Sequence, residues 1–168
     1  MLRSEVNHGF KMRLALYQPD IPQNTGTILR LAACLDIPVD IVAPTGFDMS
    51  DRSLKRAGLD YLSYVSLTRH QSWEAFNEAY LSKRDPSLSN LILLSSRGSI
   101  TYTEHTFMRD DILLLGRESA GVPEQIHQSA DAIVRIPIKE PLRSLNVAVA
   151  AAMVLGEALR QTDQYPKS

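Results

Sequence analysis

The sequence predicts a single α/β domain built on a mostly parallel sheet of about six strands. Two runs, residues 91–94 and 112–115, are apolar without alternation, which is typical of strands covered by helices on both faces. Short β-rich runs also alternate with helical stretches along the whole chain. A length of 168 residues suits one domain. We place that domain at residues 12–161, with a flexible leader at 1–11 and a tail at 162–168.

The expected strands are residues 14–17, 39–42, 62–67, 91–94, 112–115 and 132–136. Asn24 or Thr25 is expected to cap a helix that runs through Leu35, and Ser50 and Ser72 to cap short helices at 51–57 and 73–80. Ser144 is expected to begin a long helix that ends at 161. Residues 147–156 of this helix are apolar on every side, which predicts a subunit interface.

Composition excludes several classes of protein. Lysine and arginine number 18 and aspartate and glutamate 19, a net charge of −1, so a nucleic acid would have to bind a local basic patch. A single cysteine, Cys34, excludes internal disulfides and a paired-cysteine metal site. The four histidines lack metal-ligand spacing, and we predict no metal. No apolar run reaches a membrane span, and the N-terminus lacks a secretory signal, so we expect a cytoplasmic protein.

The sequence lacks the common nucleotide-binding and hydrolase motifs. Three other segments stand out, at residues 19–30, 113–123 and 135–146. Each lies at or just after a predicted strand, where α/β proteins place functional loops. Gly116 would let a ligand approach the backbone closely, Glu118 could bind a cation or a hydroxyl group, and Arg30 offers a fixed positive charge. Taken alone, the first segment is also explained by a capped helix start with a tight turn, and the second by a plain turn.

Taken together and in order, four segments resemble the motifs of the SPOUT methyltransferase superfamily, and most closely the YibK-like tRNA 2′-O-methyltransferases. They read LYQPDIPQNTGTILRLAA, RSLKRAGLDY, LLLGRESAGVP and RIPI…RSLNVAVAAAMVLGEALRQ. The resemblance covers residues 12–161. It implies a C-terminal deep trefoil knot, S-adenosylmethionine as cofactor, and a homodimer packed through the knot region and the last helix. The implied reaction is methylation of the ribose 2′-hydroxyl of the tRNA wobble nucleotide, a cytidine or modified uridine.

The resemblance also implies roles for individual residues. Cofactor contacts fall on Leu94, Gly116, Ile136 and Ser144, with Leu115, Ile138 and Leu145 as neighbours. The catalytic candidates are Arg30, Asn24, Glu118 and Asn146. Arg30 matches an arginine proposed as the base, but a guanidinium stays protonated, so it could instead hold a phosphate or stabilise the developing alkoxide. We expect Glu118 to orient Arg30 and Asn146 to brace the third loop; a plain loop-stabilising role is the alternative for Asn24, Glu118 and Asn146.

RNA is expected to bind a local patch of Arg52, Lys55, Arg56 and Arg69, although a solvated basic face is the simpler reading of that cluster. The chain departs from many relatives at Arg117, where they have proline. It also departs at Ala148, Val149 and Gly156, near the expected dimer contact. Two other functions stay open at this point. One is 2′-O-methylation of ribosomal RNA or of another tRNA position, and the other is a non-catalytic RNA-binding dimer.

Overall fold

A computed structural model describes residues 11–50, 52–58 and 61–168. Its described part contains a seven-stranded sheet in the order β3-β2-β1-β6-β4-β7-β5, in which every neighbouring pair is parallel. The strands are β1 (Arg13–Tyr17), β2 (Val39–Val42), β3 (Leu67–His70), β4 (Leu91–Leu94), β5 (Ile100–Thr101), β6 (Ile112–Leu115) and β7 (Ala132–Arg135). The predicted single α/β domain is confirmed, with one strand more than expected.

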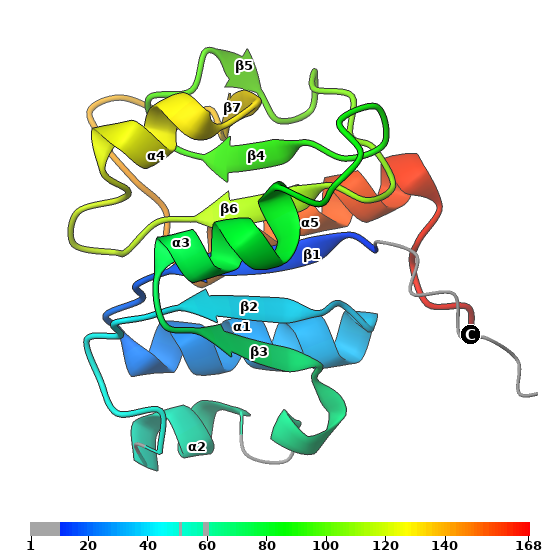
Figure 1. Cartoon of the computed structure of the whole chain (residues 1–168). Coiled ribbons are helices and arrows are strands. Elements are labelled where there is room, and N and C mark those ends of the chain that lie inside the picture. The colour runs from blue at the N-terminus through cyan, green and yellow to red at the C-terminus, as the bar shows by residue number, and fades with distance from the viewer. Residues whose placement is uncertain (1–10, 51, 59–60) are drawn as a thin grey trace, which may run out of the picture.

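Helices cover both faces of this sheet (Figure 1). They are α1 (Pro22–Leu35), α2 (Arg52–Gly58), η1 (Leu62–Tyr64), α3 (Trp73–Phe76), η2 (Asn77–Leu81), α4 (Glu124–Ser129) and α5 (Val147–Thr162). Figure 1 shows α3 and α4 in front of the sheet and α1 and α5 behind it. The predicted leader lies outside the described residues, except for its last residue, Lys11.

Successive side chains of each strand point to opposite faces of the sheet, and each face is covered by its own layer of helices. In β6, Leu113 and Leu115 join the apolar cluster under α1 and α5, whereas Ile112 and Leu114 join the cluster under α3 and α4. All four side chains are buried. A parallel strand between two helical layers must be apolar at every position, and for this reason the unbroken apolar runs identified β4 and β6 correctly.

The third predicted strand is displaced and one strand was not predicted. Residues 62–64 form the single 3₁₀ turn η1, and β3 begins only at Leu67. Strand β3 lies at the sheet edge, where Thr68 and Arg69 are exposed, so it lacks the apolar signature, while Leu62 and Val65 pack on the core from outside the sheet. Strand β5 has two residues and pairs with β7 at the edge of the sheet. Two residues are too few to show an alternation of apolar and polar side chains in the sequence.

Three helix boundaries also differ from prediction. Helix α1 begins at Pro22, with Ile21 as an N-cap that makes no side-chain bond, because proline is pre-set for the first helical position. Helix α5 begins at Val147, with Asn146 as its N-cap. Asn24 and Ser144 therefore do not serve as caps. Ser72 does cap α3, accepting a bond from the Ala75 amide at 3.1 Å, as predicted, but the last turn of that helix is π-helical.

The C-terminal tail folds back onto α5. The hydroxyl of Tyr165 donates to the carbonyl of Gly156 at 3.1 Å, and a Cβ added at Gly156 would lie 3.0 Å from that hydroxyl. Tyr165 thus occupies the space that a side chain at position 156 would fill. Ala148, another departure from the resemblance, faces the core and is buried, where a polar side chain would need a partner.

The front layer of the sheet contains a buried charged cluster. Asp40 accepts a 2.7 Å contact from Nε2 of His70, and its other oxygen lies 3.4 Å from Nε of Arg13. The Arg13 guanidinium also lies 3.8 Å over the centre of the Tyr80 ring, which the π-helical turn presents to it. Burial raises the pKa of Asp40, and the Arg13 guanidinium opposes that shift. The cluster joins β1, β2, β3 and η2.

Replacing Asp40 by alanine is expected to lower the free energy of unfolding by about 3–5 kcal/mol, because the buried Arg13 charge would lose its compensation. Urea denaturation followed by circular dichroism measures this change. The matched control is Asp36→Asn, which breaks the exposed pair with Lys11 and should leave the unfolding midpoint nearly unchanged. Equal small effects of the two variants would show that the buried cluster does not stabilise the fold.

Candidate functional site

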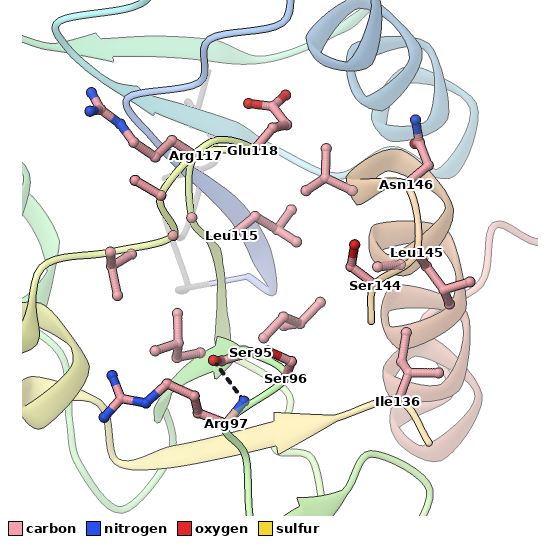
Figure 2. A pocket seen from close by; sticks show the side chains of 18 of the residues that line it. Ser95, Ser96, Arg97, Leu115, Arg117, Glu118, Ile136, Ser144, Leu145 and Asn146 are labelled. Carbon is pink, nitrogen blue, oxygen red and sulfur yellow. Dashed lines mark hydrogen bonds between the residues drawn. The ribbon is translucent and has the colours of Figure 1, made fainter. Parts of the chain in front are cut away.

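A cavity of about 690 Å³ lies at the carboxyl ends of β4, β6 and β7. This volume is in the range of roughly 300–1,000 Å³ that is usual for small-molecule sites. Its walls come from the turn after β4, the loop after β6, the segment between β7 and α5, and the first turns of α1 and α5. Figure 2 shows Ser95 and Ser96, Glu118, and the pair Ser144 and Asn146 on different sides of one hollow. The three loops singled out in the sequence therefore meet at one place.

All seven predicted cofactor contacts line this cavity. They are Leu94, Leu115, Gly116, Ile136, Ile138, Ser144 and Leu145. The strands deliver them, because parallel neighbours end at the same edge of the sheet: Leu94 is the register partner of both Leu115 and Val134. Their role as cofactor contacts stays a prediction, but their assembly from separate segments between residues 94 and 145 follows from the fold.

A reciprocal pair of hydrogen bonds joins the first and second loops. The amide of Asp20 donates to Oε2 of Glu118 at 3.0 Å, and the amide of Glu118 donates to Oδ1 of Asp20 at 3.0 Å. The Ser119 hydroxyl donates to the other oxygen of Asp20. Hydrogen bonding with Glu118 lowers the pKa of Asp20 to about 2, whereas burial and the contact with Asp20 raise the pKa of Glu118. As the pH falls, Asp20 therefore keeps its negative charge to a lower pH than Glu118 does.

Asn24 continues this connection to the third loop. Its Nδ2 lies 3.4 Å from Oε1 of Glu118, and its Oδ1 accepts a bond of 2.8 Å from Nδ2 of Asn146. Oδ1 of Asn146 in turn caps α5 through the Ala148 and Val149 amides, at 2.8 and 3.3 Å. We call this chain of contacts, Asp20–Glu118–Asn24–Asn146, the loop bridge. Asn24 can take part because it stands in the third position of α1 rather than at its cap.

Glycine at position 116 allows the second loop to close on itself. The backbone of Arg117 exchanges two hydrogen bonds with Gly121, at 3.1 and 2.8 Å. A Cβ on Gly116 would lie 2.7 Å from Gly121 backbone atoms, so no larger residue fits without moving the loop. Gly121 itself has a φ of 64°, in the left-handed region that glycine adopts without strain. The expected close approach at Gly116 is thus made by the chain's own backbone.

Arg30 does not line the cavity. Its guanidinium lies 4.5 Å over the centre of the Tyr61 ring, and Nη2 donates to the Tyr61 hydroxyl at 3.3 Å. The structure gives no hydrogen bond or ion pair between Arg30 and Glu118, and the orientation of Arg30 by Glu118 stays a prediction. In the structure, Tyr61 holds Arg30 through a cation–π contact. The sequence offered no signal for this pairing, because the two residues come from different motifs.

The predicted RNA-binding residues lie away from the cavity mouth, on α2 and β3. Arg52, Lys55, Arg56 and Arg69 are all exposed, and α2 packs against α1. Tyr64, with 76% of its surface exposed, follows in the adjoining turn η1. Single-stranded nucleic acid uses exposed aromatic side chains for stacking and basic side chains for phosphate contacts.

The cavity also contains polar residues that the sequence reasoning missed. Ser95, Ser96 and Arg97 form the turn after β4, and His127 and Arg143 complete the lining. Nε2 of His127 is buried and has no hydrogen-bond partner among the described residues. The turn was detectable in principle, because a polar Ser-Ser-Arg-Gly run follows directly on a buried parallel strand.

The part of the chain that the structure describes contains neither a metal-binding cluster nor a membrane-spanning helix. Within residues 11–50, 52–58 and 61–168, no three histidine, cysteine or acidic side chains are grouped so that they could hold a metal ion. Within the same ranges, every helix is too short or too polar to cross a lipid bilayer.

Comparison with known proteins places this geometry in a family. Residues 11–156 match the model of the SpoU rRNA Methylase family. The chain is 59% identical, over 92% of its length and 94% of the relative's, to the tRNA (cytidine(34)-2′-O)-methyltransferase of Beijerinckia indica subsp. indica. It is 36% identical to the enzyme of that name from Escherichia coli K12, over 92% and 96% of the two chains.

Solved structures agree with the sequence relatives. One that gives structural insights into 2′-OH methylation of C/U34 on tRNA superimposes with a TM-score of 0.82 at 42% identity, covering 90% of this chain and 96% of the other. The SpoU methyltransferase AviRb from Streptomyces viridochromogenes, in complex with AdoMet, gives a TM-score of 0.82 at 25% identity, covering 90% and 58%. From its sequence match and from its fold, the chain belongs to the SpoU rRNA Methylase family.

Proposed function

We propose that this protein is a tRNA (cytidine(34)-2′-O)-methyltransferase that uses S-adenosylmethionine. The observation that carries the proposal is the single cavity built by three motif loops, in a chain whose relatives of that name align over nearly their whole length. The chain covers 96% of the solved chain whose structure concerns C/U34 of tRNA, but only 56% of the rRNA methyltransferase from Sinorhizobium meliloti. That difference favours tRNA over ribosomal RNA as substrate.

The residues of the cavity suit S-adenosylmethionine. Leu94, Leu115 and Ile136 offer an apolar wall for a flat ring, and the turn at Ser95 and the hydroxyl of Ser144 offer polar partners. The unpartnered Nε2 of His127 supplies a further polar atom on the wall. S-adenosylmethionine, when bound, supplies a methyl group made electrophilic by its sulfonium. This chain's residues have to bind it, orient a ribose hydroxyl towards it and stabilise the oxygen as its proton leaves.

Glu118 and Asn24 stand at the cavity edge with hydrogen-bonding groups already oriented by the loop bridge. They act as positioning residues, since their polar atoms are engaged with each other and with Asp20 and Asn146. Arg30, held on Tyr61, carries a permanent positive charge. We assign it to the substrate, where it holds a phosphate next to the target ribose or stabilises the alkoxide, and not to the cofactor.

We further propose that the protein acts as a homodimer through α5. Val149 and Met153, four residues apart on one side of that helix, are 49% and 38% exposed, and Leu142 and Leu145, in the segment before the helix, are 69% and 40% exposed. A monomer rarely leaves such a set of apolar side chains in water. We include two further properties in this proposal. The protein has the C-terminal deep trefoil knot that the resemblance implies, and it is located in the cytoplasm.

The reaction is tested directly by mass spectrometry of total tRNA from a strain that lacks the gene. We expect one wobble nucleotide to lose its 2′-O-methyl group, and purified enzyme with S-adenosylmethionine to restore it. An unchanged tRNA profile, with a methyl group lost from ribosomal RNA instead, would replace this function by the ribosomal alternative. No change in either RNA, and no cofactor binding by calorimetry, would support the non-catalytic alternative.

Removing Asn146, the asparagine at the third-loop end of the loop bridge, is expected to weaken cofactor binding. Asn146→Ala deletes an N-cap and the bond to Asn24, so the third loop loses its attachment to the first. Ser72→Ala deletes an N-cap of α3 far from the cavity and is the matched control. Both variants should lose about 1 kcal/mol of unfolding free energy, but calorimetry should show weaker S-adenosylmethionine binding for Asn146→Ala alone. Equal cofactor affinity in the two variants would contradict the bridge.

Arg30→Ala and Arg30→Lys are both expected to reduce kcat by roughly 10²–10³-fold. Lysine keeps the charge but loses the planar fork, which contacts both the face and the hydroxyl of Tyr61. Cofactor affinity should stay at the wild-type value, because Arg30 lies outside the cavity. A lysine variant with substantial activity would argue against both roles considered for Arg30.

A further inference from the structure

A second, smaller hollow lies beside the main cavity. It has a volume of about 190 Å³ and is lined by Tyr17 and Gln18 at the end of β1, and by Arg117 and residues 120–123 from the loop after β6. We call it the side cavity. Arg117 and residues 120–122 line both hollows, so the closed loop after β6 forms the wall between them.

The side cavity lies on the side of the wall that faces the end of β1. Tyr17 and Val122 pack in the apolar cluster under α3 and α4. The main cavity shares Val122 with the side cavity but also extends to Val147 and Val154 of α5, behind the sheet. Strands β1 and β6 are neighbours, yet α1 leaves β1 behind the sheet and α4 follows β6 in front of it (Figure 1). A crevice where neighbouring strands send their helices to opposite faces is the usual binding position in open α/β sheets.

Arg117 is fixed in this crevice but its charge is not paired. Nη2 donates to Oε1 of Gln18 at 2.6 Å, and Nε is buried without a hydrogen-bond partner. Among the described residues, no carboxylate lies within 4 Å of the guanidinium. Figure 2 shows the side chain extending away from the centre of the main cavity. Gln18, its partner, has a φ of 43°, an uncommon conformation that tends to persist at functional sites.

The acidic groups nearest in sequence are engaged elsewhere. Asp20 accepts from the Glu118 amide and the Ser119 hydroxyl, and Glu118 accepts from the Asp20 amide and from Asn24. The oxygen of the Gln18 amide is already used by Arg117, so the groups of Gln18 and Arg117 that stay available are N–H donors. A planar guanidinium with free donors and no carboxylate partner is suited to a phosphate oxyanion.

We propose that the side cavity is a phosphate-binding site, in which Arg117 holds a phosphodiester of the RNA backbone close to the nucleotide that is methylated. The proposal rests on the proposed function, since it takes the RNA substrate as given. The RNA would then contact the protein at two places. One is the basic surface of α2 and β3, which lies away from the cavity mouth, and the other is Arg117, next to the cavity in which the reaction takes place. A chain of RNA that crosses the wall between the hollows would present its ribose to one and its phosphate to the other.

The test compares variants in binding to an anticodon stem-loop RNA at several salt concentrations, followed by fluorescence anisotropy. Arg117→Gln should weaken RNA binding about tenfold, equally for stem-loops of different base sequence, and should lower the slope of log affinity against log salt by about 0.7–0.9. Arg117→Lys should keep the wild-type slope while recovering part of the affinity. Affinity for S-adenosylmethionine should fall much less than RNA affinity in both variants, because the Arg117 side chain extends away from the centre of the main cavity.

The matched control is Lys83→Gln. Lys83 is exposed and precedes β4, at the edge of the sheet where the strands begin. The Lys83→Gln substitution therefore removes one positive charge far from both hollows. It should leave the RNA affinity and its salt dependence unchanged. An Arg117→Gln variant with wild-type affinity and slope would overturn the proposal, as would a loss confined to cofactor binding. A loss that depends on base sequence at an unchanged slope would also overturn it. Methyl transfer by the wild-type protein to tRNA tests the proposed function separately.

Discussion

The double use of the Asn24 side chain is the interaction on which the rest of the site depends. One end of its amide faces Glu118 in the second loop and the other accepts from Asn146 in the third, a residue 122 positions away in sequence. Each such bond contributes only about 1 kcal/mol. Their effect is geometric, because three loops that are mobile when separate become the walls of one cavity when they are tied together.

The parallel sheet makes this arrangement possible. Leu16, Leu94 and Leu115 stand in register at the ends of adjacent strands, so the segments that follow them must emerge at the same edge. The close packing of Gly116 against Gly121, and of Gly46 against Asp20, where an added Cβ would meet Asp20 at 2.7 Å, leaves little room for these loops to shift. The loops of the site are therefore positioned by the ends of the strands that form the core, and not by a separate domain.

The sequence was sufficient for the buried central strands, because an unbroken apolar run is a local pattern that identified β4 and β6. The family resemblance identified seven of the residues that line the cavity, from Leu94 to Leu145. The sequence was insufficient where tertiary context decides. Pro22 moved the start of α1 and so released Asn24 from capping. The polar edge strand β3 did not carry an apolar signature, and the contact of Arg30 with Tyr61 joins two motifs whose spacing says nothing about their approach. The unpaired charge of Arg117 likewise became visible only once its neighbours were known.

The central claim is that three loops, joined through Asn24, form a single site for the methyl donor. A crystal structure of the protein with S-adenosylmethionine tests it most directly. The account predicts the donor in the hollow between Leu94, Gly116, Ile136 and Ser144, touching residues of the second and third loops at once while the Asn24–Asn146 bond is kept. A donor bound outside that hollow, or one held by a single loop with this bond broken, would contradict it.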